Sequence, residues 1–81
     1  MKIKYFAWIK DITEKEKEII NDPNINNIDD LKTYLQKKYP KIEKHMQQDL
    51  IRIAINYEYC VKNISLSSND EIAIFPPVSG G

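Results

Sequence analysis

The sequence predicts an α+β domain in which one main helix packs across one face of a β-sheet. Apolar and polar residues alternate in several short segments, which is the period of a strand, whereas segment 29–38 repeats apolar residues at helical spacing. Strand segments lie on both sides of this helical segment, an order typical of α+β folds. With 81 residues, the chain has room for one domain with a modest core.

The charge composition argues against two broad classes of function. Lysine plus arginine and aspartate plus glutamate number 12 each, so the net charge is zero. General nucleic-acid binding and membrane-surface binding both favour an excess of basic residues. Met1 to Lys4 carry charge where a secretory signal needs an apolar run, and no apolar run is long enough to span a bilayer. We therefore expect a cytoplasmic protein without nucleic-acid or membrane partners.

The first quarter of the chain predicts two strands joined by a polar connection. A period of two runs from residue 2 to residue 9, with inward positions expected at Ile3, Tyr5, Ala7 and Ile9. Segment 10–17 is polar and is expected to form a short helical turn or a hairpin loop. Glu18–Ile20 predicts a short second strand, and the cluster Asn21–Asn24 predicts a turn.

The main helix is expected to begin after Asn27 or Asp29, because either side chain can cap a helix. Asp29 and Asp30 place negative charge in its first turn, where the helix dipole favours it. The inward face follows i, i+3, i+4 and i+7 spacing and consists of Leu31, Tyr34, Leu35 and Lys38, with the lysine stem lying at its edge. Pro40 restricts the residue before it and predicts the end of the helix.

Segment 41–49 is polar and less regular, and it can hold a second helical turn that ends near Gln48. A third strand is predicted next, with inward positions at Ile51, Ile53 and Ile55. Asn56-Tyr57 stands where a tight turn into a short strand at 58–61 is expected. Glycine is the usual residue after asparagine in such a turn, so Tyr57 leaves the turn type open.

The last strand leads directly into the C-terminal tail. After a turn-rich connector at 65–70, Ile72 and Ile74 are expected to face the core, and Phe75 to face away. Pro76 and Pro77 cannot donate to a sheet ladder, so pairing should end at about Phe75, and they favour an extended chain. The six residues from 76 to 81 can reach roughly 20 Å when extended. We therefore expect a folded domain over 1–75 and a flexible tail over 76–81.

The end of the tail, Gly80-Gly81, is the strongest candidate for a reactive site. Neither glycine has a Cβ, so a partner enzyme can close a narrow channel around the extended backbone. The α-carboxylate of Gly81 is ionised at neutral pH and can attack an activated phosphate such as that of ATP. The resulting acyl adenylate is ready for group transfer.

These residues carry a resemblance to a known family. Segment 70–81, which ends in Phe75-Pro76-Pro77-Val78-Ser79-Gly80-Gly81, closely resembles the C-terminus of the small subunits of molybdopterin synthase, which are ubiquitin-like sulfur carriers. Segments 2–7, 30–40 and 51–56 are similar to that family's first strand, main helix and the strand before its hairpin. The resemblance implies the β-grasp fold, a mixed sheet in which the first and last strands pair in parallel at the centre.

The resemblance also implies how the tail works. Gly81 would be adenylated with ATP by an adenylyltransferase of the ubiquitin-activating type, and a sulfurtransferase would then convert the adenylate into a thiocarboxylate. Within a heterotetramer, the tail would donate this sulfur to cyclic pyranopterin monophosphate in the large catalytic subunit of molybdopterin synthase. Gly80 would pass the narrow channel, and Phe75 would be the apolar anchor of a docking segment that includes Pro76, Pro77, Val78 and Ser79. The chain itself is expected to bind no cofactor or metal and to be a non-catalytic subunit.

Alternatives remain open at this stage. A thiamine-pathway sulfur carrier shares the fold and the Gly-Gly end, although the Pro-Pro before the tail favours the molybdopterin assignment over this carrier, and over a tRNA-thiolation or protein-conjugating relative. A β-grasp interaction domain with an inert tail would instead bind a partner through its sheet. Cys60, the only cysteine, is interpreted as a packing residue, with a reactive thiol as the alternative, and His45, the only histidine, as a surface residue.

Overall fold

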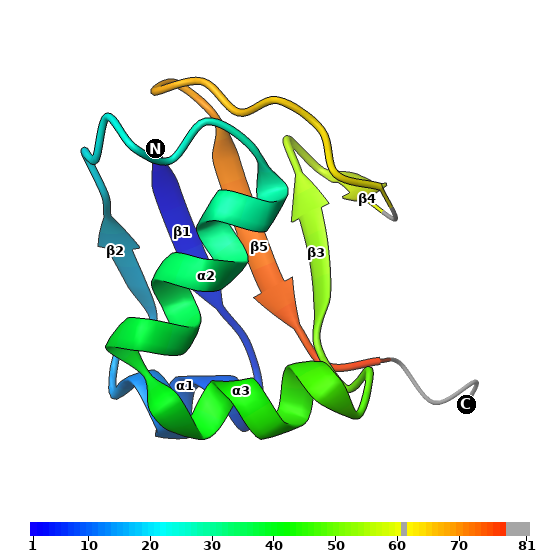
Figure 1. Cartoon of the computed structure of the whole chain (residues 1–81). Helices are drawn as coiled ribbons and strands as arrows, with labels where there is room; N and C mark the ends of the chain where they lie inside the picture. Colours follow the sequence, from blue (N-terminus) through cyan, green and yellow to red (C-terminus); the bar gives the residue numbers. More distant parts are fainter. Residues whose placement is uncertain (61, 78–81) are drawn as a thin grey trace.

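A computed structural model of the chain describes residues 1–60 and 62–77. The elements in these residues are β1 (Lys2–Tyr5), α1 (Ile9–Thr13), β2 (Lys17–Ile19), α2 (Ile28–Lys38), α3 (Pro40–Gln47), β3 (Arg52–Ile55), β4 (Glu58–Cys60) and β5 (Glu71–Phe75). The five strands form one sheet, and α2 lies across one of its faces, while α1 and α3 lie at one end (Figure 1). The predicted α+β architecture with one main helix across the sheet is confirmed.

The first and last strands lie side by side in parallel. The strand order is β2-β1-β5-β3-β4, and the register of the central pair sets Ile3 opposite Ile72 and Tyr5 opposite Ile74. The other neighbours, β1 with β2, β5 with β3 and β3 with β4, are antiparallel. This mixed order is the β-grasp arrangement that the resemblance implied, and the alternation of residues alone did not determine it.

Strand β1 is shorter than the sequence alternation suggested. Its pairing ends at Tyr5, and Ala7 takes a left-handed backbone with φ of 54°, which turns the chain out of the sheet. Ile9 then begins α1 and is fully buried, because the short helix turns its side chain back toward the core. The prediction of a strand reaching Ile9 was therefore wrong, whereas the helical turn predicted within 10–17 is confirmed in α1.

Of the two capping residues that the sequence left open for α2, the structure uses Asn27 and not Asp29. The Asn27 side chain caps α2 by accepting a hydrogen bond from the backbone N–H of Asp30 at 2.8 Å. Leu31 and Leu35 are fully buried. Pro40 ends this helix and also begins α3, since a proline is tolerated at the first position of a helix, where its missing N–H is not needed. Helix α3 is longer than the single turn predicted for this segment.

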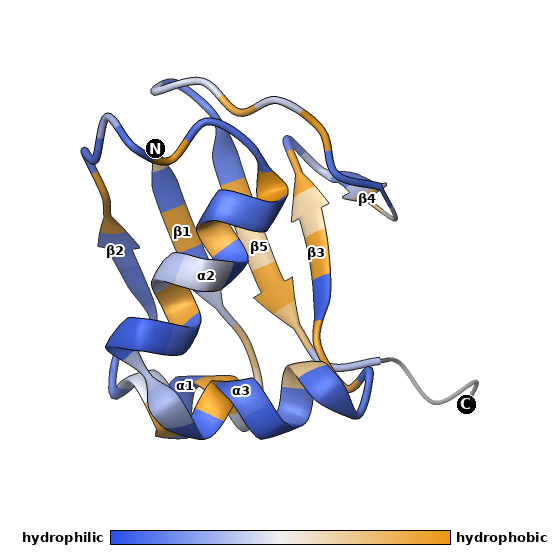
Figure 2. Cartoon of the chain, viewed as in Figure 1, coloured by the Kyte–Doolittle hydropathy of each residue, from blue (hydrophilic) through white to orange (hydrophobic). Residues whose placement is uncertain are grey.

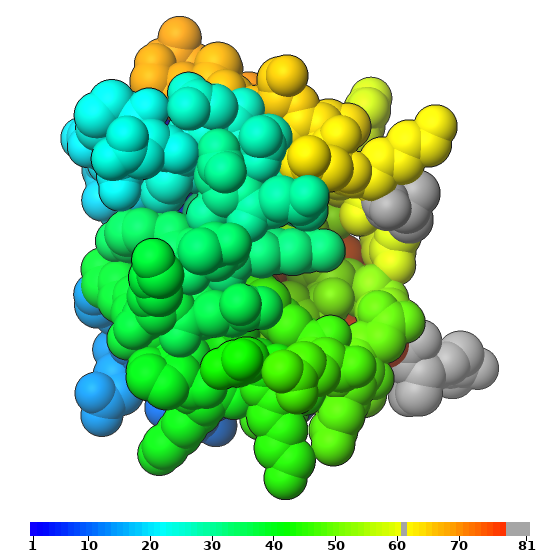
Figure 3. All heavy atoms as spheres, in the orientation of Figure 1, coloured from blue at the N-terminus to red at the C-terminus, as the bar shows by residue number. Residues whose placement is uncertain are grey.

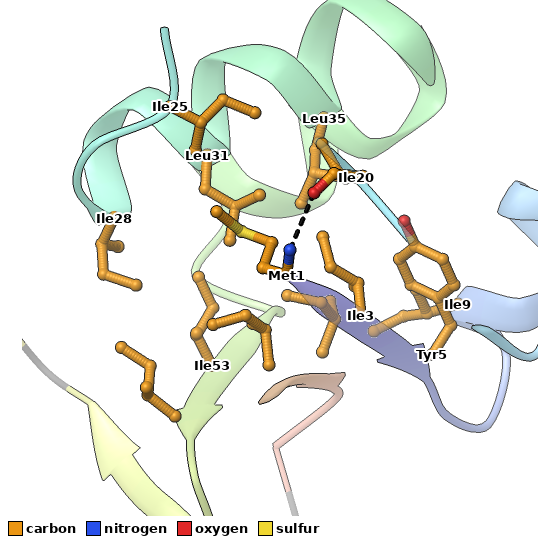
Figure 4. Packing of buried hydrophobic residues seen from close by; sticks show 13 residues of the cluster. Met1, Ile3, Tyr5, Ile9, Ile20, Ile25, Ile28, Leu31, Leu35 and Ile53 are labelled. Carbon is orange, nitrogen blue, oxygen red and sulfur yellow. Dashed lines mark hydrogen bonds between the residues drawn. The ribbon is translucent and has the colours of Figure 1, made fainter. Parts of the chain in front are cut away.

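The core lies between α2 and the sheet (Figure 4). Alternate residues of three strands and one face of α2 fill it, namely Ile3, Tyr5, Ile53, Ile55, Ile72, Ile74, Leu31 and Leu35. Met1 joins them, and its amino group donates a hydrogen bond to the carbonyl of Ile20 at 2.8 Å. Figure 2 shows polar residues on the outer sides of the helices and apolar residues on the strands beneath them. Across the residues described, no helix is long and apolar enough to cross a membrane.

Candidate functional site

The tail leaves the domain from the strand at the centre of the sheet. Strand β5 ends at Phe75 and is followed by Pro76 and Pro77, both half-buried, so pairing stops where the prolines were predicted to stop it (Figure 1). The end of β5 lies at the same end of the sheet as α1 and α3. The remaining predicted site residues, Val78, Ser79, Gly80 and Gly81, lie outside the described residues, and their roles stay predictions.

Phe75 lies on the outer face of the sheet, the face opposite α2. Within β5, Ile72 and Ile74 are buried on the α2 side, and the residues between them point the other way, as predicted. The Phe75 ring packs against the ring of Tyr59 edge to face, with the centroids 6.2 Å apart and the planes inclined at 68°. Tyr59 lies on the edge strand β4, so Phe75, the last residue before the tail, is held by a side chain from another strand.

Sequence reasoning did not select Tyr59 as a site residue. Its neighbour Cys60 lies opposite Ile53, whose side chain is in the core, and this alternation turns Tyr59 outward. A short strand was predicted at 58–61, but so short a segment does not show by its alternation which side chains face outward. The observed strand, β4, has three residues.

Several large aromatic side chains are exposed on the same side of the sheet as Phe75. The exposed fraction is 56% for Tyr59, 87% for Tyr57 and 45% for Phe6, and the backbone N–H of Phe6 donates to the carbonyl of Ile74, next to Phe75. We refer to Phe6, Tyr59 and Phe75 as the aromatic face, and Tyr57 lies beyond it, in the turn beside Glu71. Large exposed apolar side chains gathered on one side of a small domain are typical of a protein-binding surface.

Charged residues border the aromatic face. The Lys4 ammonium lies 2.7 Å from a carboxylate oxygen of Glu71, and this pairing raises the pKa of Lys4. The pKa of the Glu71 carboxyl is lowered, first by the hydrogen bond from Lys4 and next by one from the Tyr57 hydroxyl. At the other end of the face, Arg52 donates to the carboxylate of Asp49 at 2.8 Å. These pairs leave the aromatic face with an apolar centre and a polar rim, as in protein interfaces.

A second polar cluster, centred on Glu18, lies away from the tail. The Glu18 carboxylate accepts hydrogen bonds from the Tyr39 hydroxyl at 2.5 Å, from Lys15 at 3.1 Å and from Lys38 at 3.2 Å. Burial alone would raise the pKa of this carboxyl, but the three donors outweigh burial and lower the pKa. The cluster ties the edge strand β2 to the end of α2, so its role is structural.

Cys60 is half-buried at the edge of the core, and its thiol donates a hydrogen bond to the carbonyl of Lys62 at 2.9 Å. The structure thus agrees with the interpretation of Cys60 as a packing residue. His45 is not a plain surface residue, as the sequence suggested. It is half-buried because α3 stacks its ring on that of Trp8, with the centroids 4.6 Å apart.

A hollow opens on the α2 side of the sheet, between α2 and the segment that follows β4 (Figure 3). Its volume is roughly 470 Å³, and its lining mixes apolar side chains such as Ile28 and Ile53 with charged ones such as Lys32. Within residues 1–60 and 62–77, no group of three or more His, Cys, Asp and Glu side chains could hold a metal ion. Tyr59 and Arg52 also line the hollow, so it reaches the edge of the sheet beside the aromatic face.

Comparisons with known proteins agree on one family. The model of the ThiS family matches residues 3–81. The molybdopterin synthase sulfur carrier subunit of Dictyostelium discoideum is 39% identical, over 99% of this chain and 94% of that protein. A structure from Pyrococcus furiosus, assigned as molybdopterin converting factor subunit 1, superposes with a TM-score of 0.83 at 26% identity, over 95% of each chain. A complex of subunits 1 and 2 of the molybdopterin-converting factor from Helicobacter pylori contains a chain with a TM-score of 0.70 and 28% identity, over 99% of this chain and 96% of that one.

Proposed function

Because this chain belongs to the ThiS family and groups with the molybdopterin synthase sulfur carrier subunits, we propose that it carries sulfur on its C-terminus for the synthesis of molybdopterin. The sulfur is held as a thiocarboxylate on Gly81. The acceptor is cyclic pyranopterin monophosphate, and its dithiolene needs two sulfur atoms, one from each of two loaded carriers. The chain is thus the carrier subunit of molybdopterin synthase, and the large subunit supplies the catalytic groups.

Loading of Gly81 proceeds in two steps. A carboxylate oxygen attacks the α-phosphorus of ATP on an adenylyltransferase of the ubiquitin-activating type, and pyrophosphate leaves. A hydrosulfide equivalent delivered by a sulfurtransferase then attacks the acyl carbon, and AMP leaves. The thiocarboxylate is a better nucleophile than the original carboxylate, and after sulfur donation an ordinary C-terminus remains that can be loaded again. ATP is therefore a substrate of the partner enzyme, while this chain provides only the terminal acyl group.

The observation that carries this proposal is the way the tail starts. Phe75 is fixed in the central strand and packed on Tyr59, and Pro76 and Pro77 end the sheet pairing directly after it. The six residues from 76 to 81 can reach roughly 20 Å, enough to carry the carboxylate into an active site while the domain stays outside. A residue held in the sheet, followed by a segment without bulky side chains at its end, suits a carrier that delivers its C-terminus to several enzymes.

Docking to the large subunit uses the aromatic face. This face borders the base of the tail, and aromatic side chains make up a large share of the energetic hot spots of protein interfaces. The similar chain from Helicobacter pylori was solved in complex with the second subunit of its molybdopterin-converting factor, which supports the same kind of assembly for this chain. We propose a heterotetramer with two large subunits at its centre and one carrier subunit at each end.

The thiamine-pathway carrier is the second candidate, since the matching family model bears the name ThiS and the Gly-Gly end fits both pathways. The Dictyostelium relative favours the molybdopterin assignment, as does the Pro-Pro sequence before the tail. An interaction domain with an inert tail is the third, and it makes no use of the Gly-Gly end.

Intact-mass spectrometry tests the proposal. The chain is incubated with ATP, a sulfur source and the adenylyltransferase of its own organism. We expect a mass gain equal to the replacement of one oxygen by sulfur, and no gain in a chain that lacks Gly81. Loss of the gain on adding the large subunit and cyclic pyranopterin monophosphate identifies the acceptor. If an adenylyltransferase that is demonstrably active leaves the mass of this chain unchanged, the proposal is wrong.

A further inference from the structure

We propose that Tyr57, at the tip of the β3–β4 turn, is a second docking residue for the large subunit, with its ring seated in an apolar recess of that partner. This inference rests on the proposed function, because the large subunit is the partner that it names. It extends the contact from Phe75, at the base of the tail, to the opposite end of the sheet.

The backbone of the β3–β4 turn carries a strain that glycine would avoid. Ile55 lies opposite Glu58, so Asn56 and Tyr57 alone form the loop, and both have positive φ, at 49° and 71°. Such two-residue turns favour asparagine at the first position and glycine at the second. Tyrosine pays a steric cost for this conformation, because its Cβ crowds the backbone in the left-handed region.

The turn is nevertheless held firmly. The backbone N–H of Asn56 donates to the carbonyl of Glu71 at 2.8 Å, and the Asn56 side chain accepts from the backbone N–H of Glu71 and donates to Asp70, both at 3.0 Å. These bonds fix the turn to the start of β5. Tyr57 is therefore presented in a defined place, and little ordering is needed when a partner binds it.

Tyr57 points to the outer face of the sheet, since its hydroxyl lies close enough to Glu71 to lower the pKa of that carboxyl, after the stronger effect of Lys4. Its exposed fraction of 87% is the highest among the large apolar side chains exposed in the described residues. In the isolated domain, the strained backbone at Tyr57 is thus not offset by packing of its ring. Strain of this kind persists mainly where function requires it.

The geometry of the face points to the large subunit as the occupant. Glu71 and Phe75 are the two ends of β5, so Tyr57 lies about 13 Å from Phe75 along the strand direction. A typical protein interface covers about 800 Å² on each partner and is thus roughly 30 Å across. An interface of this size centred on the base of the tail extends about 15 Å in each direction and therefore includes Tyr57.

The test replaces Tyr57 by glycine and measures two quantities of opposite expected sign. Removing the backbone strain should raise the Tm of the free chain by about 4 °C. Removing the ring should weaken binding to the large subunit from the same organism, measured by isothermal titration calorimetry, by about tenfold. Tyr57→Phe keeps the ring and should bind within about threefold of the original chain, because the ring makes the contact and the lost hydroxyl faces Glu71 of the same chain rather than the partner.

Glu14→Gly is the matched control. Glu14 ends α1 with φ of 60°, and it is exposed and lies outside the aromatic face, so its replacement should raise the Tm and leave the affinity unchanged. An unchanged affinity in Tyr57→Gly, or an equal loss in Glu14→Gly, overturns the inference while binding of the original chain still supports the carrier assignment. If the original chain does not bind the large subunit, the proposed assembly and this inference both fail.

Discussion

The ring of Phe75 meets the ring of Tyr59 edge to face across the strand that separates them. Phe75 belongs to β5 and Tyr59 to β4, and between them β3 presents Ala54, which lies opposite both Tyr59 and Ala73. Because alanine side chains are short, the two rings meet above them. Edge-to-face pairs of this kind contribute about 0.5–1.5 kcal/mol beyond the burial of their area. The base of the tail is thereby tied to the edge strand of the sheet.

Phe75→Ala is expected to weaken binding to the large subunit by about tenfold while the domain stays folded, since Phe75 is half-buried and lies outside the core. The loss of the ring pair should lower the free energy of unfolding by about 1–2 kcal/mol. Calorimetric titration measures the affinity, and urea denaturation measures the stability. Ile19→Ala is the control, because Ile19 is exposed by 73% on β2, at the other edge of the sheet. Equal affinities for the original chain and Phe75→Ala would exclude Phe75 as an anchor.

Adding one alanine after Gly81 is expected to abolish sulfur loading. The acyl group would then stand one residue further out and carry a Cβ that a channel shaped for glycine excludes. Intact-mass spectrometry after incubation with ATP, sulfur source and adenylyltransferase measures the loading, and a Tm equal to that of the original chain shows that the domain is unaffected. Full loading of the extended chain would show that the activating enzyme needs neither a terminal glycine nor this tail length, against the proposed channel.

Glu18→Gln is expected to destabilise the fold at pH 7 by about 1–3 kcal/mol, because it removes a charged acceptor from three donors. The pKa of Glu18 is lowered in the fold, so its contribution is fully present above the unfolded pKa of about 4.3 and is lost as the pH falls through the folded pKa. The difference in Tm between the two chains should therefore shrink below about pH 4. Glu16→Gln, an exposed carboxylate nearby, should leave the Tm at pH 7 almost unchanged. A difference that is constant with pH would show that the charge of Glu18 is not what stabilises the fold.

Asn27→Ala is expected to cost about 1 kcal/mol of unfolding free energy, because the backbone N–H of Asp30 loses its acceptor at the start of α2. Urea denaturation measures the loss. Asn26→Ala is a close control, since Asn26 takes part through its backbone, donating to Asp30 and accepting from Leu66. Equal losses in the two variants would mean that the cap is not the source of the stability.

Local signals in the sequence predicted most of the elements. Asn27, one of the two predicted caps, and Pro40 mark the limits of α2, because capping and the missing proline N–H act within one helical turn. The alternation around Ile72 and Ile74 predicted which side of β5 is buried, for the same reason. The prediction of a strand through Ala7 and Ile9 was wrong because the chain turns at Ala7 and Ile9 begins a short helix. Ile9 is buried in that helix as it would have been in a strand, so the periodicity of the sequence could not distinguish the two.

The sequence alone predicted where sheet pairing ends and the tail begins, because Pro76 and Pro77 act through their own backbone properties and need no neighbours, while the chemistry of the Gly-Gly end stays a proposal. It also determined the burial of the α2 face and of alternate strand residues. Only the tertiary structure decided that Tyr59 packs on Phe75, that His45 stacks on Trp8 and that β1 and β5 pair in parallel. These contacts join residues far apart in the chain, and their free energy depends on the packing of the whole sheet, which no local pattern contains.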